Sequence, residues 1–222
     1  MAENRIENLR CPKCNNHYEF KVFEFIDIAQ NPELEDFVKS GDVFFPKCPH
    51  CTHLRVLSHD LLYIDMSGKF IIKLIHDQNA FARHYELLTS ENTKFLKRLM
   101  FSDRYKVRIV NNIDNFIEKL GILSSKYDDR IIELTKAIVM SDFISENPDT
   151  VNMSKDKIQL FVNTVGDPVV TIILNGEFVK DVELPEDIYE LFNSQIDEIN
   201  MQTDTPSINY SWALNYLHNM NK

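Results

Sequence analysis

Alternating apolar side chains near the N-terminus predict a long β-strand. In HYEFKVFEFIDI, residues 17–28, apolar residues recur at every second position among residues that favour strands. Asn31 and Pro32 then predict the start of a short helix over ELEDFVKS, residues 33–40, because asparagine caps helices and proline suits their first position. Gly41 is expected to end that helix.

Two further β-rich runs follow this helix, and DVFFPK, residues 42–47, is a strand-like segment that leads towards them. The runs are HLRVLSHDLLYIDM, residues 53–66, and KFIIKLIH, residues 69–76, with a tight turn at Ser67-Gly68. Together with the first strand they predict a small antiparallel meander with one inserted helix.

The middle of the chain is predicted to be mainly helical. Residues 78–100 have a helical composition with weak periodicity, and RYKVRIV, residues 104–110, alternates like a strand. Apolar spacings of three and four predict helices over residues 112–120 and 128–143, which Gly121 separates. The buried stripe of the second of these helices is expected to contain Ile131, Leu134, Ile138 and Val139.

The C-terminal third predicts a small sheet followed by helices. Three strands are expected between residues 157 and 184, and the last two meet at Asn175-Gly176, the dipeptide that type I′ hairpins prefer. Helices are expected over residues 185–199 and 211–220. The whole chain is therefore predicted to be an α+β protein.

Composition and charge indicate where the protein is located and which partners it disfavours. The 222 residues are 44% apolar and 26% charged, no apolar run approaches the roughly 18 to 20 residues that span a bilayer, and the first residues lack the apolar core of a secretory signal. We therefore expect no membrane insertion and a cytoplasmic location. The net charge is −10, and residues 151–222 carry 4 basic and 11 acidic side chains, which disfavours binding to nucleic acid.

All four cysteines lie in two Cys-Pro-Xaa-Cys pairs, CPKC and CPHC. Each turn lets two thiolates reach one ion, and two such turns complete the tetrahedral sulfur shell that suits Zn²⁺. The 33 residues between the pairs exceed the roughly 15 to 20 of the simplest pattern, because a predicted strand and helix occupy them. Since four thiolates leave no open position, we predict a structural zinc site. Its ligands are Cys11, Cys14, Cys48 and Cys51.

Other interpretations of the cysteines are weaker. Iron in a rubredoxin-like centre uses the same ligands, but nothing else in the chain suggests electron transfer. CPHC alone would suit a thiol-disulfide oxidoreductase, yet such a thiol needs a following helix, and the run after Cys51 is β-rich. His17, His50 and His53 lie close enough in sequence to replace or tune a ligand, although surface histidines are the commoner case.

The two cysteine pairs, the segment NPELEDFVKSGDVFFPKC, the hairpin DLLYIDMSGKFIIKLI and the segments RIVNNIDNFIEKL and YDDRIIELTKA together resemble the CpXC family. The resemblance covers roughly residues 10–145. It implies a cysteine-ligated bacterial or archaeal domain and supplies no reaction. In zinc-ribbon knuckles a glycine often follows the second cysteine of each pair, whereas Asn15 and Thr52 stand at those positions here.

The predicted organisation follows from these features. Residues 1–145 form a CpXC-like zinc-binding region, with a zinc-ribbon-like antiparallel β unit and inserted helix over about 10–76, and a linker and helices over about 78–145. Residues 150–222 form an acidic α+β unit, an antiparallel sheet with helices.

Other candidate chemistry is sparse. Zinc-protease, nucleophile-elbow and nucleotide-binding motifs are missing from the sequence. Asp128-Asp129 could serve a metal or acid–base role, but carboxylates at a helix start are expected as caps. A basic stretch with interleaved aromatic residues could contact nucleic acid. It comprises Lys94, Phe95, Lys97, Arg98, Phe101, Arg104, Tyr105, Lys106 and Arg108.

The sequence therefore predicts a non-catalytic protein-interaction or regulatory module with a structural zinc site and an unknown protein partner. A nucleic-acid-binding zinc ribbon is the first alternative, and a CxxC thiol-disulfide oxidoreductase is the second.

Overall fold

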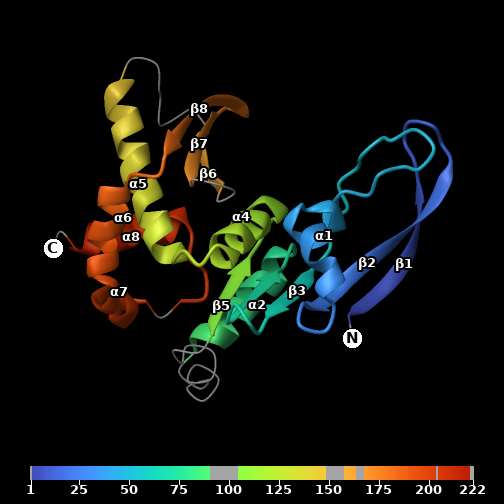
Figure 1. Cartoon of the computed structure of the whole chain (residues 1–222), viewed down its shortest axis with the longest axis horizontal. Helices are drawn as coiled ribbons and strands as arrows, with labels where there is room; N and C mark the ends of the chain where they lie inside the picture. Colours follow the sequence, from blue (N-terminus) through green and yellow to red (C-terminus); the bar gives the residue numbers. More distant parts are fainter. Residues whose placement is uncertain (1, 91–104, 149–157, 164–167, 204, 221–222) are drawn as a thin grey trace. The chain divides into compact units, whose positions relative to one another are not determined.

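In the part of the chain that the structure describes, one sheet of five strands and one of three form the framework of the fold (Figure 1). The chain divides into two units, Met1–Leu120 and Gly121–Lys222, and each contains one sheet with helices. The predicted α+β class is confirmed. The structure is a computed structural model, and it describes residues 2–90, 105–148, 158–163, 168–203 and 205–220.

The five-stranded sheet of the first unit has the strand order β1-β2-β3-β4-β5. Strands β1/β2 and β3/β4 pair antiparallel, whereas β2/β3 and β4/β5 pair parallel. The prediction of a wholly antiparallel meander is therefore wrong, because long connections after β2 and β4 allow the chain to cross over before the next strand. The strands are β1 Glu3–Arg10, β2 His17–Asp27, β3 Leu61–Asp65, β4 Phe70–Leu74 and β5 Lys106–Val110.

The longest strand, β2, confirms the prediction from its alternating pattern. Its inward side chains, such as Val22 and Ile26, are fully buried. Its partner β1 is a finding of the structure, since ENRIENLR contains only two apolar residues, Ile6 and Leu9, too few for a recognisable alternation. β2 pairs with β1 along most of its length and with β3 only at its C-terminal end.

The segment between β2 and β3 corrects a second prediction. The short helix is present as a 3₁₀ turn, η1 Pro32–Leu34, followed by α1 Glu35–Lys39. The strand predicted for residues 42–47 is wrong, because Asp42–Phe44 form a second 3₁₀ turn, η2, whose apolar side chains are buried. Between η2 and β3, the described residues form one isolated antiparallel β-bridge, from Lys47 to Leu54.

Aromatic side chains form much of the core behind β3 and β4. The Phe116 ring of α4 (Ile113–Ser124) lies edge-on to Phe44 at 5.5 Å and to Tyr63 at 6.4 Å between ring centroids. Helix α4 continues through Gly121, so this glycine does not separate two helices as predicted. A further helix, α2 (Gln78–Thr89), begins at Asp77, whose carboxylate accepts a hydrogen bond from the Ala80 amide.

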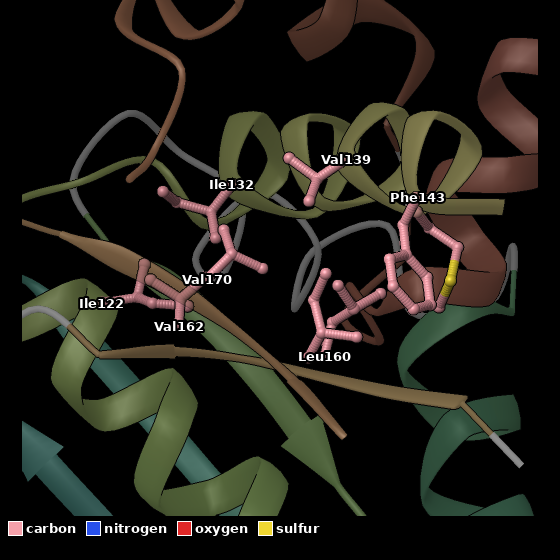
Figure 2. Close-up of a cluster of buried hydrophobic side chains, with 9 residues drawn as sticks. Ile122, Ile132, Val139, Phe143, Leu160, Val162 and Val170 are labelled. Atoms are coloured by element: carbon pink, nitrogen blue, oxygen red, sulfur yellow. The ribbon is translucent and has the colours of Figure 1, made fainter. Parts of the chain in front are cut away.

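The second unit is organised around the long helix α5, Asp129–Glu146. Ile132, Val139 and Phe143 of α5 face Leu160, Val162 and Val170 of the three-stranded sheet (Figure 2). The opposite side of α5 packs on the terminal helices through Ile131, Leu134 and Ala137. Both faces of α5 are therefore covered. The remaining elements are β6 Ile158–Asn163, β7 Val169–Leu174, β8 Glu177–Glu183, α6 Glu186–Ser194, α7 Ile196–Gln202 and α8 Tyr210–Met220.

Two predictions for the C-terminal third concern the β7–β8 turn and the helix that follows it. The β7–β8 turn has φ of 54° at Asn175 and 86° at Gly176, so the predicted type I′ hairpin is confirmed. The single helix predicted over residues 185–199 is divided into α6 and α7 at Gln195, which lies between them with ψ of 13°.

No helix in the described part of the chain is both long enough and apolar enough to cross a membrane.

We expect Gly41→Ala to cost more stability than Gly176→Ala. Both glycines have positive φ, so each alanine introduces backbone strain of about 1 kcal/mol. A Cβ at position 176 would meet open space, whereas at position 41 it would lie 2.7 Å from Ile117 Cδ1. Unfolding in urea, monitored by hydrogen exchange of peptides from each unit, measures the loss of stability in both variants. Equal losses would show that the Ile117 contact is unimportant.

Candidate metal centre

Both Cys-Pro-Xaa-Cys turns adopt the same backbone structure. In the first turn, the Cys11 amide donates to Asn16 O and the Asn15 amide donates to Cys11 O, each at 2.9 Å. In the second, the amides of Cys48 and Thr52 make the corresponding bonds to His53 O and Cys48 O, also at 2.9 Å. Two equivalent turns, one at the end of the β1–β2 hairpin and one in the segment before β3, therefore present their thiols in the same way.

The residue after each second cysteine lies in the left-handed region of backbone space. Asn15 has φ of 61° and Thr52 has φ of 58°, so each takes the conformation for which glycine is common in such turns. Asparagine tolerates this region, but a β-branched threonine is strained there. The Thr52 hydroxyl donates to the Cys51 carbonyl oxygen at 2.7 Å.

The four sulfur atoms form one cluster. All four Sγ atoms lie within 4.8 Å of one another, with Cys11 3.5 Å from Cys51 and Cys14 3.7 Å from Cys48. These distances are too long for disulfides and close to the roughly 3.8 Å between sulfurs around a tetrahedral Zn²⁺. The four predicted ligands are thus brought together in a geometry that could hold a metal ion.

Hydrogen bonds and burial shift the pKa values of two thiols, Cys11 and Cys51, in opposite directions. Burial opposes ionisation of Cys11, but backbone hydrogen bonds from Cys14 and Lys13 outweigh it and lower the pKa of this thiol to about 6. A backbone hydrogen bond from His53 favours ionised Cys51, yet burial and the neighbouring thiols raise its pKa to about 12. The cluster releases one proton readily and holds another tightly, as expected where charges of one sign are crowded and a cation could relieve them.

A small apolar cluster surrounds the thiols. Leu9 and Tyr18, which flank the first turn, are buried beside Cys11 and Cys48, and both of these cysteines are fully buried. Burial raises the pKa of the Tyr18 hydroxyl. Neither side chain was predicted to pack against the thiols, although both lie close to CPKC in the sequence. They shield one side of the cluster from water.

The nearby histidines do not join the cluster of potential ligand atoms found among the described residues. His17 is exposed, and its Nδ1 lies 3.1 Å from Asn8 Oδ1. His50 is exposed at the tip of the second turn, and His53 contributes its backbone carbonyl to that turn.

The surroundings of CPHC differ from those of a redox dithiol. Residues 48–60, all of which the structure describes, contain no helix whose N-terminus could activate Cys48. Cys48 is fully buried, and its nearest recorded thiol partner belongs to the other pair.

The remaining candidates take ordinary structural positions or lie outside the described residues. Asp128 caps α5 by accepting from the Arg130 amide, and it also pairs with the Arg130 guanidinium, so the capping interpretation is confirmed. Of the basic and aromatic stretch, Tyr105, Lys106 and Arg108 are described, and Arg108 is buried in β5. Lys94, Phe95, Lys97, Arg98, Phe101 and Arg104 lie outside the described residues.

A family model described as CpXC protein matches residues 9–136, a range that includes all four cysteines. This match confirms the resemblance inferred from the motifs. No curated protein and no solved structure matches the chain.

Relief of backbone strain in the second turn is expected to strengthen metal binding. Thr52→Gly removes a β-branched residue from a position with φ of 58°. We expect this change to stabilise the folded turn by about 1 kcal/mol and so to raise the metal affinity about fivefold. Asn15→Gly is the matched control and should change affinity little, because asparagine is already suited to this conformation. Competition with a chromophoric chelator measures both. An equal effect of the two substitutions would contradict the strain argument.

Metal affinity is also expected to rise with pH. With a pKa of about 12, the Cys51 thiol is protonated near neutrality and must release its proton when a metal binds. Each proton released on metal binding raises the apparent affinity about tenfold per pH unit, so the Cys51 proton sets a minimum slope of about tenfold, and below about pH 6 the Cys11 thiol contributes a further proton. Chelator competition between about pH 5 and pH 8 tests this slope. An affinity independent of pH would show that the thiols are not the ligands.

Proposed function

The chain belongs to the CpXC family, and we propose that its four cysteines hold Zn²⁺ in a structural role within a non-catalytic module that binds another protein. One observation carries the proposal: two turns of the same backbone structure bring four Sγ atoms within 4.8 Å of one another. Four thiolates of this spacing match the tetrahedral shell of structural zinc sites.

Zinc suits this site better than iron on chemical grounds. A shell of four sulfurs serves both metals, but iron in such a shell is an electron carrier. The sequence offers no second redox group that would exchange electrons with it. The four cysteines would fill the coordination shell, so substrate or water would find no open position, which supports a structural role over a catalytic one.

The packing around the thiols indicates what a bound metal would contribute to folding. Among the residues that the structure describes, Leu9 and Tyr18 alone are buried beside the two buried cysteines, with a few partly buried neighbours. So small an apolar cluster contributes little to folding, and a structural zinc ion contributes folding free energy directly. We therefore infer that the metal joins the β1–β2 hairpin to the segment before β3.

A protein partner in the cytoplasm is the setting that we favour. The net charge of −10 is unfavourable for contact with nucleic acid, which depends on cationic neutralisation. An oxidoreductase would need an accessible, activated first cysteine, whereas Cys48 is buried and precedes no helix.

Cys11→Ser and Cys48→Ser are expected to lose the metal and to destabilise the hairpin. Each substitution removes one buried ligand from a different turn, so both should reduce bound zinc from one equivalent to almost none. Elemental analysis of freshly purified, reduced protein measures the metal, and hydrogen exchange in β1 and β2 measures the loss of structure. His50→Ala is the matched control, because His50 is exposed in the second turn and should leave the metal in place.

Wild-type protein without bound metal would refute the metal-binding role. Bound iron in place of zinc would change the identity of the metal but not the ligands. Rapid alkylation of Cys48 in metal-loaded protein, with turnover of a test disulfide, would instead favour the oxidoreductase.

A further inference from the structure

Strand β1 forms an edge of the five-stranded sheet. It pairs with β2 on one side, and no other strand in the described part of the chain pairs with its second side. Edge strands are usually protected by proline, by charged side chains, especially lysine, or by a bulge. Glu3–Arg10 contains neither proline nor lysine, its four charged residues alternate in sign, and its irregularity lies at the first pair, between Glu3 and Asn4. Most of this edge is therefore a regular template for another strand.

The hydrogen bonds of the first turn determine which backbone groups point outwards from β1. The Cys11 amide bonds to Asn16 O, so the next pair, Arg10 with His17, is not hydrogen-bonded across the hairpin. Because bonded and non-bonded pairs alternate along an antiparallel ladder, the even-numbered residues of β1 direct their N–H and C=O groups to the open edge. These residues are Asn4, Ile6, Asn8 and Arg10.

The central outward residue has an exposed apolar side chain. Ile6 is 67% exposed, more than any other large apolar side chain in the described residues. An antiparallel strand added with twofold symmetry about Ile6 would place this side chain beside Ile6 of a second copy. The same register places Asn4 opposite Asn8 and Arg5 opposite Glu7, each twice. The strand is thus complementary to itself in charge as well as in backbone pattern.

Neighbouring registers lack this match. The outward groups allow shifts that keep even-numbered residues opposite one another. A shift in one direction places Glu7 opposite Glu7, and a shift in the other direction places Arg5 opposite Arg5. Like charges directly opposite each other are destabilising, so the Ile6-centred register is selected.

We propose that two copies of this chain associate through antiparallel pairing of β1 with β1, centred on Ile6. Three hydrogen-bonded residue pairs, Asn4 with Asn8 twice and Ile6 with Ile6, supply about six backbone hydrogen bonds. Two Arg5–Glu7 pairs set the register. The two five-stranded sheets become one continuous ten-stranded sheet, in which both open β1 edges are covered.

Charge reversal tests this register in the full-length, metal-loaded protein. Wild type should reach twice the chain mass of 26.0 kDa in sedimentation equilibrium. Arg5→Glu alone or Glu7→Arg alone creates two repulsive pairs and should weaken association by at least about tenfold. An equimolar mixture of the two variants should associate again, because opposite charges then face each other at both positions across the interface. Native mass spectrometry identifies the mixed dimer.

The mixture separates association from effects within one chain. Arg5 contacts Glu7 and Glu24 of its own chain, so each single variant also loses an internal ion pair. Mixing cannot restore that pair, and circular dichroism checks that each variant is folded. The matched control is the exposed pair Glu35–Lys39 of α1, where Glu35→Lys and Lys39→Glu should leave the dimer intact.

Three outcomes would overturn the proposal: a wild-type monomer at every accessible concentration, a dimer that both β1 variants retain, and folded variants that fail to associate on mixing. A dimer that the α1 variants disrupt would locate the interface elsewhere.

Discussion

Repulsion among crowded sulfur charges is the constraint on which the N-terminal part of this protein depends. Four Sγ atoms within 4.8 Å cannot all ionise without a cation, because thiolate charges at this spacing repel one another. Burial and hydrogen bonds place the pKa values of Cys11 and Cys51 far apart, so the two thiols differ in charge near neutrality. The backbone nevertheless favours ionised sulfur at Cys11, because hydrogen bonds from the Cys14 and Lys13 amides lower the pKa of this thiol. A divalent metal would turn this costly arrangement into a joint between two segments that are distant in sequence.

The sequence predicted the cysteines of this site better than it predicted the strands and turns that position them. Paired cysteines, with no other cysteine in the chain, indicated which thiols would meet. Strand β1 escaped prediction because it has only two apolar residues, and the strand assigned to residues 42–47 failed because Val43 and Phe44 are buried equally well by a 3₁₀ turn. Period-two alternation identifies a strand but contains no information on its neighbour or direction, so the parallel pairs of the sheet could not be predicted.

The sequence predicted a local turn more accurately than it predicted the boundaries of longer helices. Asn175-Gly176 fixes its own hairpin because both residues accept positive φ without help from the rest of the fold. Helix boundaries depend instead on tertiary contacts: Gly121 is retained inside α4, and Gln195 interrupts the pattern that joins α6 to α7. Periodicity identified a buried stripe on α5, but it could not show that this helix is covered on both sides by two different sets of partners.

The length of β2 has a consequence for cooperativity. Its 11 residues span about 35 Å, with the first cysteine turn beyond one end and the pairing with β3 at the other. The residues packed around the thiols form a cluster of their own, and a second set of β2 side chains, Val22, Phe23 and Ile26, is buried farther along the strand. Removal of a bound metal would therefore open the outer end of the hairpin as a separate folding unit, while the inner end would stay ordered. Such a strand would transmit little of a metal's stabilisation to the rest of the sheet, so the metal-free protein would combine a folded sheet with an open hairpin end.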